Sequence, residues 1–268
     1  MKTSPAPEPP AFADLAKRRF GSTGMTPAPL GLGCAYFGGE KSSDEETIAG
    51  TRRAIELGIN YVDTSPLYGE SERRIGLALA DGWRDRVYLQ TKTGTHPTRR
   101  GDYSAAATRW SVENSLKLLG TDYLDSVLIH DPEDIEVPLA KDHALEELLR
   151  LKEQGIVRHV GLGVRDHALH RRAMATGHID IVLTYLDYTL IEQSAAQGVF
   201  PDARRHGVAV ILASVFGMGQ LNGVQPGAQN ESPPYVGLIR DARVSAACGS
   251  SASVRCAASC SRHTRRCA

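Results

Sequence analysis

The sequence predicts an α/β fold, a (β/α)₈ TIM barrel that is incomplete at its eighth βα unit. Short runs rich in Val, Ile and Leu alternate with amphipathic segments between residues 30 and 212, the pattern of a parallel sheet covered by helices. With 268 residues, 41% of them hydrophobic, the chain suits one barrel better than two small domains. Several apolar runs also end in a residue that can do chemistry, as strands do at the active sites of such barrels.

The expected elements follow one another in a regular order. Residues 1–18 are expected to be a flexible leader, and 19–29 to form turns that close one end of a barrel spanning 19–223. We expect seven strands, each a short apolar run: 30–34, 59–62, 87–91, 126–129, 159–162, 179–183 and 208–212. The amphipathic segments between them predict helices at 44–57, 71–80, 139–154, 166–176 and 194–206. Gly155, Gly177 and Gly207 follow the last three, as glycine commonly does at helix ends.

An open, doubly wound sheet with a dinucleotide-binding turn is the main alternative. Residues 31–38 read G-L-G-C-A-Y-F-G, but this run departs from the dinucleotide-binding pattern at its third glycine. No acidic residue ends a second strand at the distance that a ribose requires. The barrel is therefore favoured.

The last part of the chain, 224–268, does not supply a convincing eighth unit. From Ala242 onward it contains no acidic residue, and 235–239 is its one weak strand candidate. We interpret this segment as an atypical tail, disordered or translated out of frame. It holds four of the five cysteines, Cys248, Cys256, Cys260 and Cys267, together with His263. Their spacing lacks the paired short loops of zinc sites, so we expect no metal.

Charge, apolar stretches and cysteine content restrict which partners and which cell compartment we expect. The chain has 31 basic and 31 acidic side chains, so its charge gives no reason to expect nucleic acid or an anionic membrane as a partner. No apolar stretch approaches the roughly 18 residues of a membrane span, and the N-terminus lacks the apolar region of a signal peptide. Cys34 is alone in the first 247 residues, so no disulfide framework is expected. We expect a soluble cytoplasmic protein, and the sequence gives no oligomeric state.

Four chemically capable residues lie at the ends of successive expected strands. Asp63 follows strand 59–62, with Tyr68 five residues further on, Lys92 follows 87–91, and His130 follows 126–129. In a closed parallel barrel these side chains would converge. Singly, each has a structural explanation as a turn cap, packed ring, surface charge or core histidine. Four of them at strand ends favour a shared site.

The four residue types together suit proton transfer at an oxygen atom. A tyrosine titrates near pH 10, and we expect the lysine ammonium to favour its phenolate while Asp63 keeps that lysine charged. His130 could donate a hydrogen bond to a substrate carbonyl oxygen. Such groups can protonate a forming alkoxide or take a proton from an alcohol. They contain no electron source, so we expect a bound redox cofactor and hydride transfer.

These residues and their neighbours resemble the aldo/keto reductases. The matching segments are G-I-N-Y-V-D-T-S-P-L-Y-G at 58–69 with S-E at 71–72, T-K at 91–92, L-I-H-D at 128–131 and L-K-E-Q-G-I-V-R-H-V-G at 151–161. The resemblance runs from about Leu30 to Gly223 and implies a (β/α)₈ barrel that binds NADP(H), less often NAD(H). It places Asp63, Tyr68, Lys92 and His130 in the family's catalytic tetrad, with Tyr68 as the acid/base.

The resemblance also implies a substrate class and a set of cofactor contacts. The segments 210–214 and 217–219 are most similar to sugar dehydrogenases acting on aldoses such as fucose or galactose, so the expected substrate is a small aldehyde, ketone or sugar. The residues in cofactor-binding positions are Gly33, Cys34, Gly163, Tyr185, Ser214, Phe216 and Met218.

The sequence departs from the family pattern at the cofactor positions. Gly163-Val164 replaces a common Ser-Asn pair, Tyr185 replaces a Gln, and Ala213 replaces an aromatic residue. The eighth unit, which in the family grips the adenosine ribose, has no counterpart after Gly223. A non-catalytic cofactor-binding regulatory barrel, or an inactive truncated family member, is therefore the alternative to an active oxidoreductase.

Overall fold

The structure, a computed structural model, describes residues 16–218. Its strands form one seven-stranded sheet in chain order, from β1 to β7, and every pair from β1–β2 to β5–β6 is parallel. Neighbouring parallel strands in chain order, joined by helices, are the topology of a (β/α)₈ barrel. The predicted fold class is confirmed with seven strands. The proposed tail, 224–268, and the strand candidate at 235–239 lie outside the described residues.

All seven strands occur where the apolar runs predict them, with ends that differ by one or two residues. They are β1 Leu32–Gly33, β2 Tyr61–Asp63, β3 Tyr88–Thr93, β4 Leu124–His130, β5 Val157–Gly163, β6 Ile181–Tyr185 and β7 Ala209–Ala213. The shifts matter for the site, because Asp63, Lys92 and His130 lie within the last two residues of β2, β3 and β4 rather than after them. Their backbones are thus fixed by sheet hydrogen bonds.

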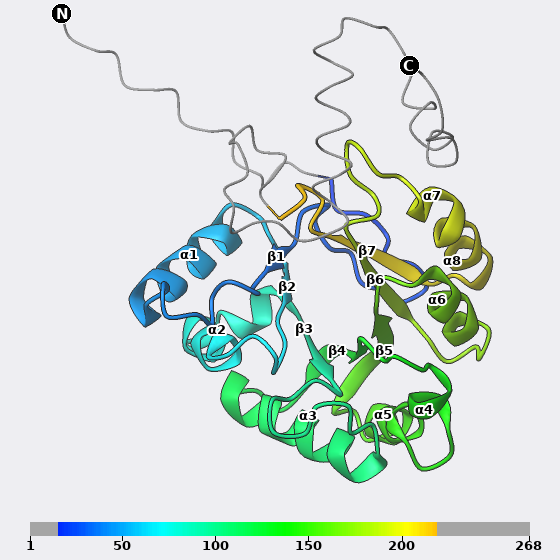
Figure 1. Cartoon of the computed structure of the whole chain (residues 1–268). Helices are drawn as coiled ribbons and strands as arrows, with labels where there is room; N and C mark the ends of the chain where they lie inside the picture. Colours follow the sequence, from blue (N-terminus) through cyan, green and yellow to red (C-terminus); the bar gives the residue numbers. More distant parts are fainter. Residues whose placement is uncertain (1–15, 219–268) are drawn as a thin grey trace, which may run out of the picture. The chain divides into compact units, whose positions relative to one another are not determined.

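The helices pack on the outer side of the sheet, and Figure 1 shows α1, α2, α3 and α5 outside β2–β5. They are α1 Asp44–Glu56, α2 Ser71–Leu79, α3 Ala105–Leu119, α4 Glu136–Leu139, α5 Ala144–Glu153, α6 His167–Met174, α7 Ala195–Gly198 and α8 Phe200–His206. A capping box between Ser43 and Glu46 begins α1, and the Asp166 side chain caps α6. Such caps satisfy backbone N–H groups that have no partner within the helix.

The described residues fall into two compact units. The first comprises residues 16–184 and 198–211, and the second comprises 185–197 and 212–218. In the first unit every residue of β4 is buried, and Leu128 of β4, Leu148 of α5 and Leu162 of β5 have no exposed surface. All four predicted catalytic residues belong to this unit.

The helix α3 was not predicted, and its composition explains why. The buried face of α3 is half polar and gives only a weak hydrophobic period. Its buried residues are Ala107, Val112 and Leu119 together with Thr108, Ser111 and Ser115. Its ends do carry signals: the Ser104 side chain accepts from the Ala107 N–H, and Gly120 takes a left-handed conformation after the last turn. Small polar residues allow close packing without an apolar stripe.

Two segments predicted as single helices are each divided in the structure. The segment 139–154 contains the end of α4 and then α5, because Asp142 adopts a left-handed φ of 57° between them. The segment 194–206 contains α7 and α8, which are separated at Val199, with Pro201 in the first turn of α8. Proline lacks the backbone N–H that a continuous helix would need at this position, and it is tolerated in a first turn.

The N-terminal turns lie at the amino-terminal ends of the strands, as expected. The N–H of Phe20 donates to the carbonyl of Met25 (3.1 Å), and that of Ser22 donates to the carbonyl of Gly207, just before β7 (2.8 Å). The Phe20 ring packs edge-on against Tyr61 of β2, with 5.5 Å between the ring centroids. This segment covers the end of the sheet opposite to Asp63, Lys92 and His130.

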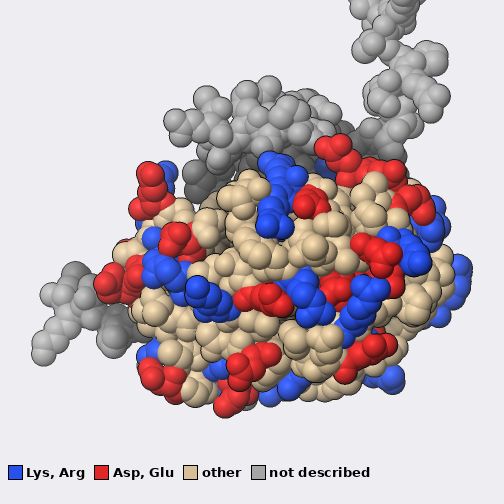
Figure 2. Space-filling model, turned by 90° about the horizontal axis from the view of Figure 1, so that it is seen from below, with Lys and Arg blue, Asp and Glu red and all other residues tan. Residues whose placement is uncertain are grey.

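Basic and acidic side chains are interspersed over the face shown in Figure 2, the lower side of Figure 1. Ion pairs join different helices: Arg109 of α3 lies 2.6 Å from Glu147 of α5, and Arg73 of α2 lies 2.7 Å from Asp44 of α1. This pairing of opposite charges agrees with the balanced composition of the chain.

Neither a membrane helix nor a metal centre is found in residues 16–218. No helix there has both the length and the apolar character to cross a bilayer. No group of three or more His, Cys, Asp and Glu side chains in the same residues is placed to hold a metal. The cysteine-rich segment around His263 lies outside them.

Candidate active site

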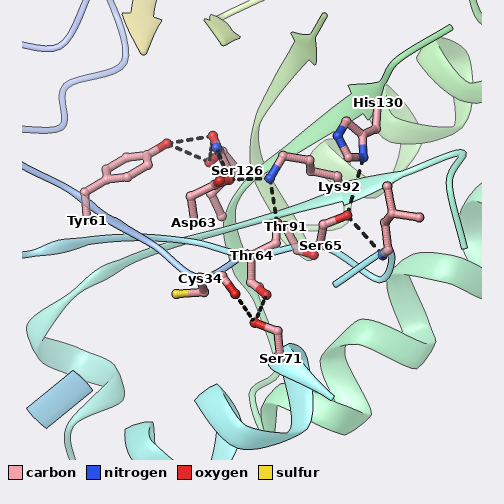
Figure 3. Close-up of polar contacts among 12 residues, drawn as sticks. Cys34, Tyr61, Asp63, Thr64, Ser65, Ser71, Thr91, Lys92, Ser126 and His130 are labelled. Atoms are coloured by element: carbon pink, nitrogen blue, oxygen red, sulfur yellow. Dashed lines mark hydrogen bonds and ion pairs between the residues drawn. The ribbon is translucent and has the colours of Figure 1, made fainter. Parts of the chain in front are cut away.

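The structure brings the four predicted catalytic residues together at the carboxyl edge of the sheet. Asp63, Lys92 and His130 come from β2, β3 and β4, and Tyr68 comes from the loop between β2 and α2. Figure 3 shows Lys92 between Asp63 and His130, with its ammonium directed toward Asp63. Because these strands are parallel neighbours, their carboxyl ends meet at one edge.

Lys92 is a buried cation held by oxygen atoms. Its Nζ donates to Oδ1 of Asp63 (2.7 Å) and to the carbonyl of Thr64 (2.8 Å), and its side chain is only 1% exposed. Burial by itself would lower the pKa of Lys92, but the attraction of Asp63 and Tyr68 raises it above the ordinary value. The ammonium therefore stays charged beside the tyrosine.

The Tyr68 ring lies between the lysine and the histidine. Its centroid is 4.8 Å from Nζ of Lys92 and 6.2 Å from the centroid of the His130 ring, to which it is perpendicular. Burial raises the pKa of Tyr68, and the charge of Lys92 only partly opposes this rise. Lys92 does favour the phenolate, as expected, but burial outweighs its effect on the pKa of Tyr68. The phenol remains neutral at pH 7 and can donate its proton.

A close backbone contact fixes the loop that carries Tyr68. The Tyr68 N–H donates to the carbonyl of Ser65 (3.0 Å), and the Glu70 N–H donates to the carbonyl of Gly38 (3.2 Å). A Cβ atom at Gly38 would lie 1.4 Å from the backbone oxygen of Tyr68, so only glycine fits there. Gly69, at φ +57°, turns the chain directly after Tyr68.

His130 is a buried, neutral imidazole with partners on both ring nitrogens. Its Nδ1 lies 2.7 Å from Oγ1 of Thr95 and 3.4 Å from Oγ of Ser65, and its Nε2 lies 3.5 Å from Oδ2 of Asp131. Burial, and then the positive charges of Lys92 and Arg100, lower the pKa of His130 to about 3. A neutral ring can donate one hydrogen bond, as expected for a group that orients a carbonyl oxygen.

A second polar network lies beneath the four residues and was not predicted. The amide of Gln90 donates to Oδ1 of Asp63 (2.7 Å), and Oε1 of Gln90 accepts from the hydroxyls of Tyr61 (2.8 Å) and Ser126 (3.0 Å). Gln90 could have been found, because it precedes Lys92 by two residues in β3 and so faces the same side of the strand. Thr95 follows its strand in a loop and carries no such signal.

The predicted cofactor-binding residues of the first unit differ in solvent exposure and in the free space around them. Gly33, at the end of β1, is exposed, and a Cβ atom there would meet nothing within 4 Å. Gly163 ends β5 opposite His130, and a Cβ atom there would come within 3.9 Å of the histidine ring. Cys34 has no exposed surface, burial raises the pKa of its thiol, and its carbonyl accepts from the Ser71 hydroxyl (2.9 Å). Its side chain therefore offers nothing to a ligand in this structure.

The remaining predicted cofactor positions belong to the second unit. Tyr185 is partly exposed, Phe216 and Met218 are exposed, and Ser214 is exposed with a φ of 55°. The Leu186 N–H donates to the carbonyl of Ala213 within this unit (3.2 Å).

Comparison with known proteins identifies the family. Residues 29–235 match the aldo/keto reductase family. The chain belongs to this family. The match continues beyond Gly223, where we expected the resemblance to end. Aldo/keto reductases are oxidoreductases, so membership makes this chain an oxidoreductase by family.

The relatives include sugar dehydrogenases and enzymes of known structure. A D-threo-aldose 1-dehydrogenase from a Pseudomonas species is 31% identical over 76% of this chain and 70% of its own length. L-Galactose dehydrogenase from Arabidopsis thaliana is 31% identical over 81% of this chain and 70% of its own length. An aldo-keto reductase from Klebsiella pneumoniae, solved in complex with NADPH, shares the fold with a TM-score of 0.65, 27% identity and coverage of 78% of this chain and 71% of its own.

Proposed function

We propose that this aldo/keto reductase transfers a hydride between a nicotinamide cofactor and a carbonyl carbon or the C1 of an aldose, with Tyr68 donating or accepting the proton. The observation that carries the proposal is the buried Asp63–Lys92 pair directly beside a neutral phenol. It supports the assignment of Asp63, Tyr68, Lys92 and His130 as the catalytic residues.

The residues present fit a nicotinamide cofactor. A Cβ atom at Gly33 would meet nothing within 4 Å, so space is open at the end of β1, and Gly163 places no side chain beside His130. Phe216 and Met218 expose 63% and 51% of their surface, so their side chains are accessible to a ligand. We propose that Gly33 and Gly163 of the first unit contact the cofactor, and that Cys34 contributes only through its backbone. The family resemblance supports the same role for Tyr185, Ser214, Phe216 and Met218 of the second unit. When bound, the nicotinamide supplies or accepts the hydride.

The side chains of this protein would then manage the proton and the substrate oxygen. His130 donates a hydrogen bond to the carbonyl oxygen and so orients it. Tyr68 delivers its proton to that oxygen as charge develops on it, and the Lys92 ammonium stabilises the phenolate that remains. Asp63 keeps Lys92 charged and directed toward the ring. In the oxidative direction the same groups remove the proton from the hydroxyl.

The relatives support a substrate class and a cofactor preference. One relative is named D-threo-aldose 1-dehydrogenase and another L-galactose dehydrogenase, so we propose small aldehydes, ketones and sugars as substrates. A neighbour was solved with NADPH, which supports NADP(H) ahead of NAD(H). A cytoplasmic location stays a prediction from the sequence.

Fluorescence titration of the full-length protein with NADPH and NADH, followed by turnover assays, tests this proposal. We expect NADPH to bind more tightly than NADH, and an aldose such as L-galactose or L-fucose to be oxidised with NADP⁺. Binding without turnover of any aldose, aldehyde or ketone would support the regulatory alternative. Failure to bind either nucleotide would support an inactive family member.

A further inference from the structure

Two hydroxyl groups converge on one nitrogen of His130, and neither was part of the predicted site. Oγ1 of Thr95 lies 2.7 Å from Nδ1, and Oγ of Ser65 lies 3.4 Å from the same atom. Both residues are buried, with 4% of Thr95 and none of Ser65 exposed. Solvent therefore cannot replace either contact freely.

The surroundings of the ring decide which nitrogen carries its proton. A neutral imidazole has one N–H and one acceptor nitrogen. Nε2 lies 3.5 Å from the carboxylate of Asp131, and a negative charge at that distance favours an N–H over a lone pair on Nε2. The proton is therefore assigned to Nε2 from this charge and from the two hydroxyls beside Nδ1. Nδ1 must then accept, and the hydroxyls of Thr95 and Ser65 are able to donate to it.

Thr95 is the better donor of the two. Its contact with Nδ1 is 0.7 Å shorter than that of Ser65. The Ser65 hydroxyl also accepts from the Leu67 N–H at 3.2 Å. The shorter distance makes Thr95 the principal partner of Nδ1.

The loop after β3 holds Thr95 and the His130 backbone together. Gly94, at φ +93°, turns the chain, and a Cβ atom there would lie 2.0 Å from the Tyr103 ring. The Tyr103 hydroxyl donates to the carbonyl of His130 (2.7 Å), and the Gly101 N–H donates to the carbonyl of Gly94 (2.8 Å). One loop thus fixes both the ring and the backbone of the histidine.

We propose that Thr95 is a positioning residue: by donating to Nδ1 it holds His130 in the tautomer whose Nε2–H can point at a substrate oxygen. This inference rests on the proposed function, in which His130 orients the carbonyl. Without the Thr95 hydroxyl, the proton can move to Nδ1 and donate to Ser65. Nε2 then becomes an acceptor and repels a carbonyl oxygen.

The test compares three variants of the full chain. Thr95→Val removes the hydroxyl at nearly constant volume, and Thr95→Ser restores it. Thr98→Val is the matched control, because Thr98 lies in the same loop, is exposed, and contacts His96 rather than His130 (2.9 Å). Protein labelled with ¹⁵N-histidine reports the protonated ring nitrogen by NMR, with the His130 signal assigned by its loss in His130→Gln.

We expect the wild type, Thr95→Ser and Thr98→Val to carry the proton on Nε2 of His130, and Thr95→Val to show a mixture of tautomers. Turnover of a carbonyl substrate should fall about tenfold in Thr95→Val, the equivalent of one neutral hydrogen bond, with unchanged NADPH affinity and recovery in Thr95→Ser. A proton on Nδ1 in the wild type, or a Thr95→Val protein that keeps the Nε2–H form, overturns the inference whatever the turnover. If the wild type is inactive but its tautomer depends on Thr95, the inference stands and the proposed function fails.

Discussion

Replacing Asp63 with Asn isolates the charge that the structure uses to keep Lys92 protonated. Asn retains an oxygen that can accept from Lys92 and Gln90, so the change removes the negative charge with little change in shape. At the observed 2.7 Å and an effective dielectric constant of about 20, the lost attraction is about 6 kcal/mol. Breaking a buried pair typically costs about 3–5 kcal/mol, and the retained hydrogen bonds place this variant near the lower end.

The loss of stability in Asp63→Asn is limited, because Lys92 can release its proton rather than remain a buried charge without a counterion. At pH 7, neutralising a lysine with an ordinary pKa of about 10.4 costs about 5 kcal/mol, but at pH 9.5 it costs only about 1 kcal/mol. In the wild type the folded pKa of Lys92 is raised, so its contribution persists until the pH passes that value. In the variant the folded pKa falls below the unfolded one, so stability recovers as the pH rises toward 10.4.

Urea unfolding at pH 7 and pH 9.5 measures both effects. We expect Asp63→Asn to lower the free energy of unfolding by about 3 kcal/mol at pH 7 and by about 1 kcal/mol at pH 9.5. Asp81→Asn is the control, because Asp81 forms an exposed pair with Arg52 (3.5 Å) that contributes at most about 1 kcal/mol. A loss below 1 kcal/mol at pH 7, or one that does not shrink at pH 9.5, would refute the assignment of Asp63 as the group that holds Lys92 charged.

Two further predictions concern Gly38 and His130. Gly38→Ala forces the backbone away from Tyr68, so we expect the free energy of unfolding to fall by about 1–3 kcal/mol and turnover to fall as well. The control is Gly39→Ala, because a Cβ atom at Gly39 meets nothing within 4 Å. Equal stability and turnover of the two variants would show that the close contact at Gly38 is unimportant. Burial lowers the pKa of His130 to about 3 in the folded protein, whereas its pKa in the unfolded chain is about 6.5. On acidification the unfolded chain therefore binds the proton first. The free energy of unfolding should fall by about 2 kcal/mol between pH 6.5 and pH 5. Urea unfolding of His130→Gln should show a smaller decline over this range, and an identical decline would mean that the imidazole is not buried in its neutral form.

The strands were predictable because each is a short apolar run, and the helix α5 was predictable because its buried face is apolar. The buried face of α5 contains Leu145, Leu148 and Leu151, which gives a clear helical period. The buried face of α3 relies on Thr108 and Ser115, which resemble loop residues in a single sequence. Packing against neighbouring helices replaces the apolar stripe there, and packing is not visible in a pattern of residue types.

In the candidate site, too, some features were visible in the sequence and others depended on packing. Residues at strand ends converge by topology, so Asp63, Lys92 and His130 could be grouped before any coordinates were known. The net pKa of Tyr68 could not be predicted, since it depends on how far burial outweighs the nearby ammonium. Thr95 could not be predicted either, because the turn at Gly94 and its contact with Tyr103 decide where its hydroxyl points.

The most direct test of the proposed chemistry is turnover by a Tyr68→Phe protein with a substrate that the wild type uses. The variant should lose at least about 100-fold in turnover, the usual contribution of a general acid, while its affinity for NADPH stays within error of the wild type. Tyr88→Phe, which removes a phenol at the opposite end of β3, should behave like the wild type. If Tyr68→Phe keeps wild-type turnover, another group moves the proton and the proposed role of Tyr68 is wrong.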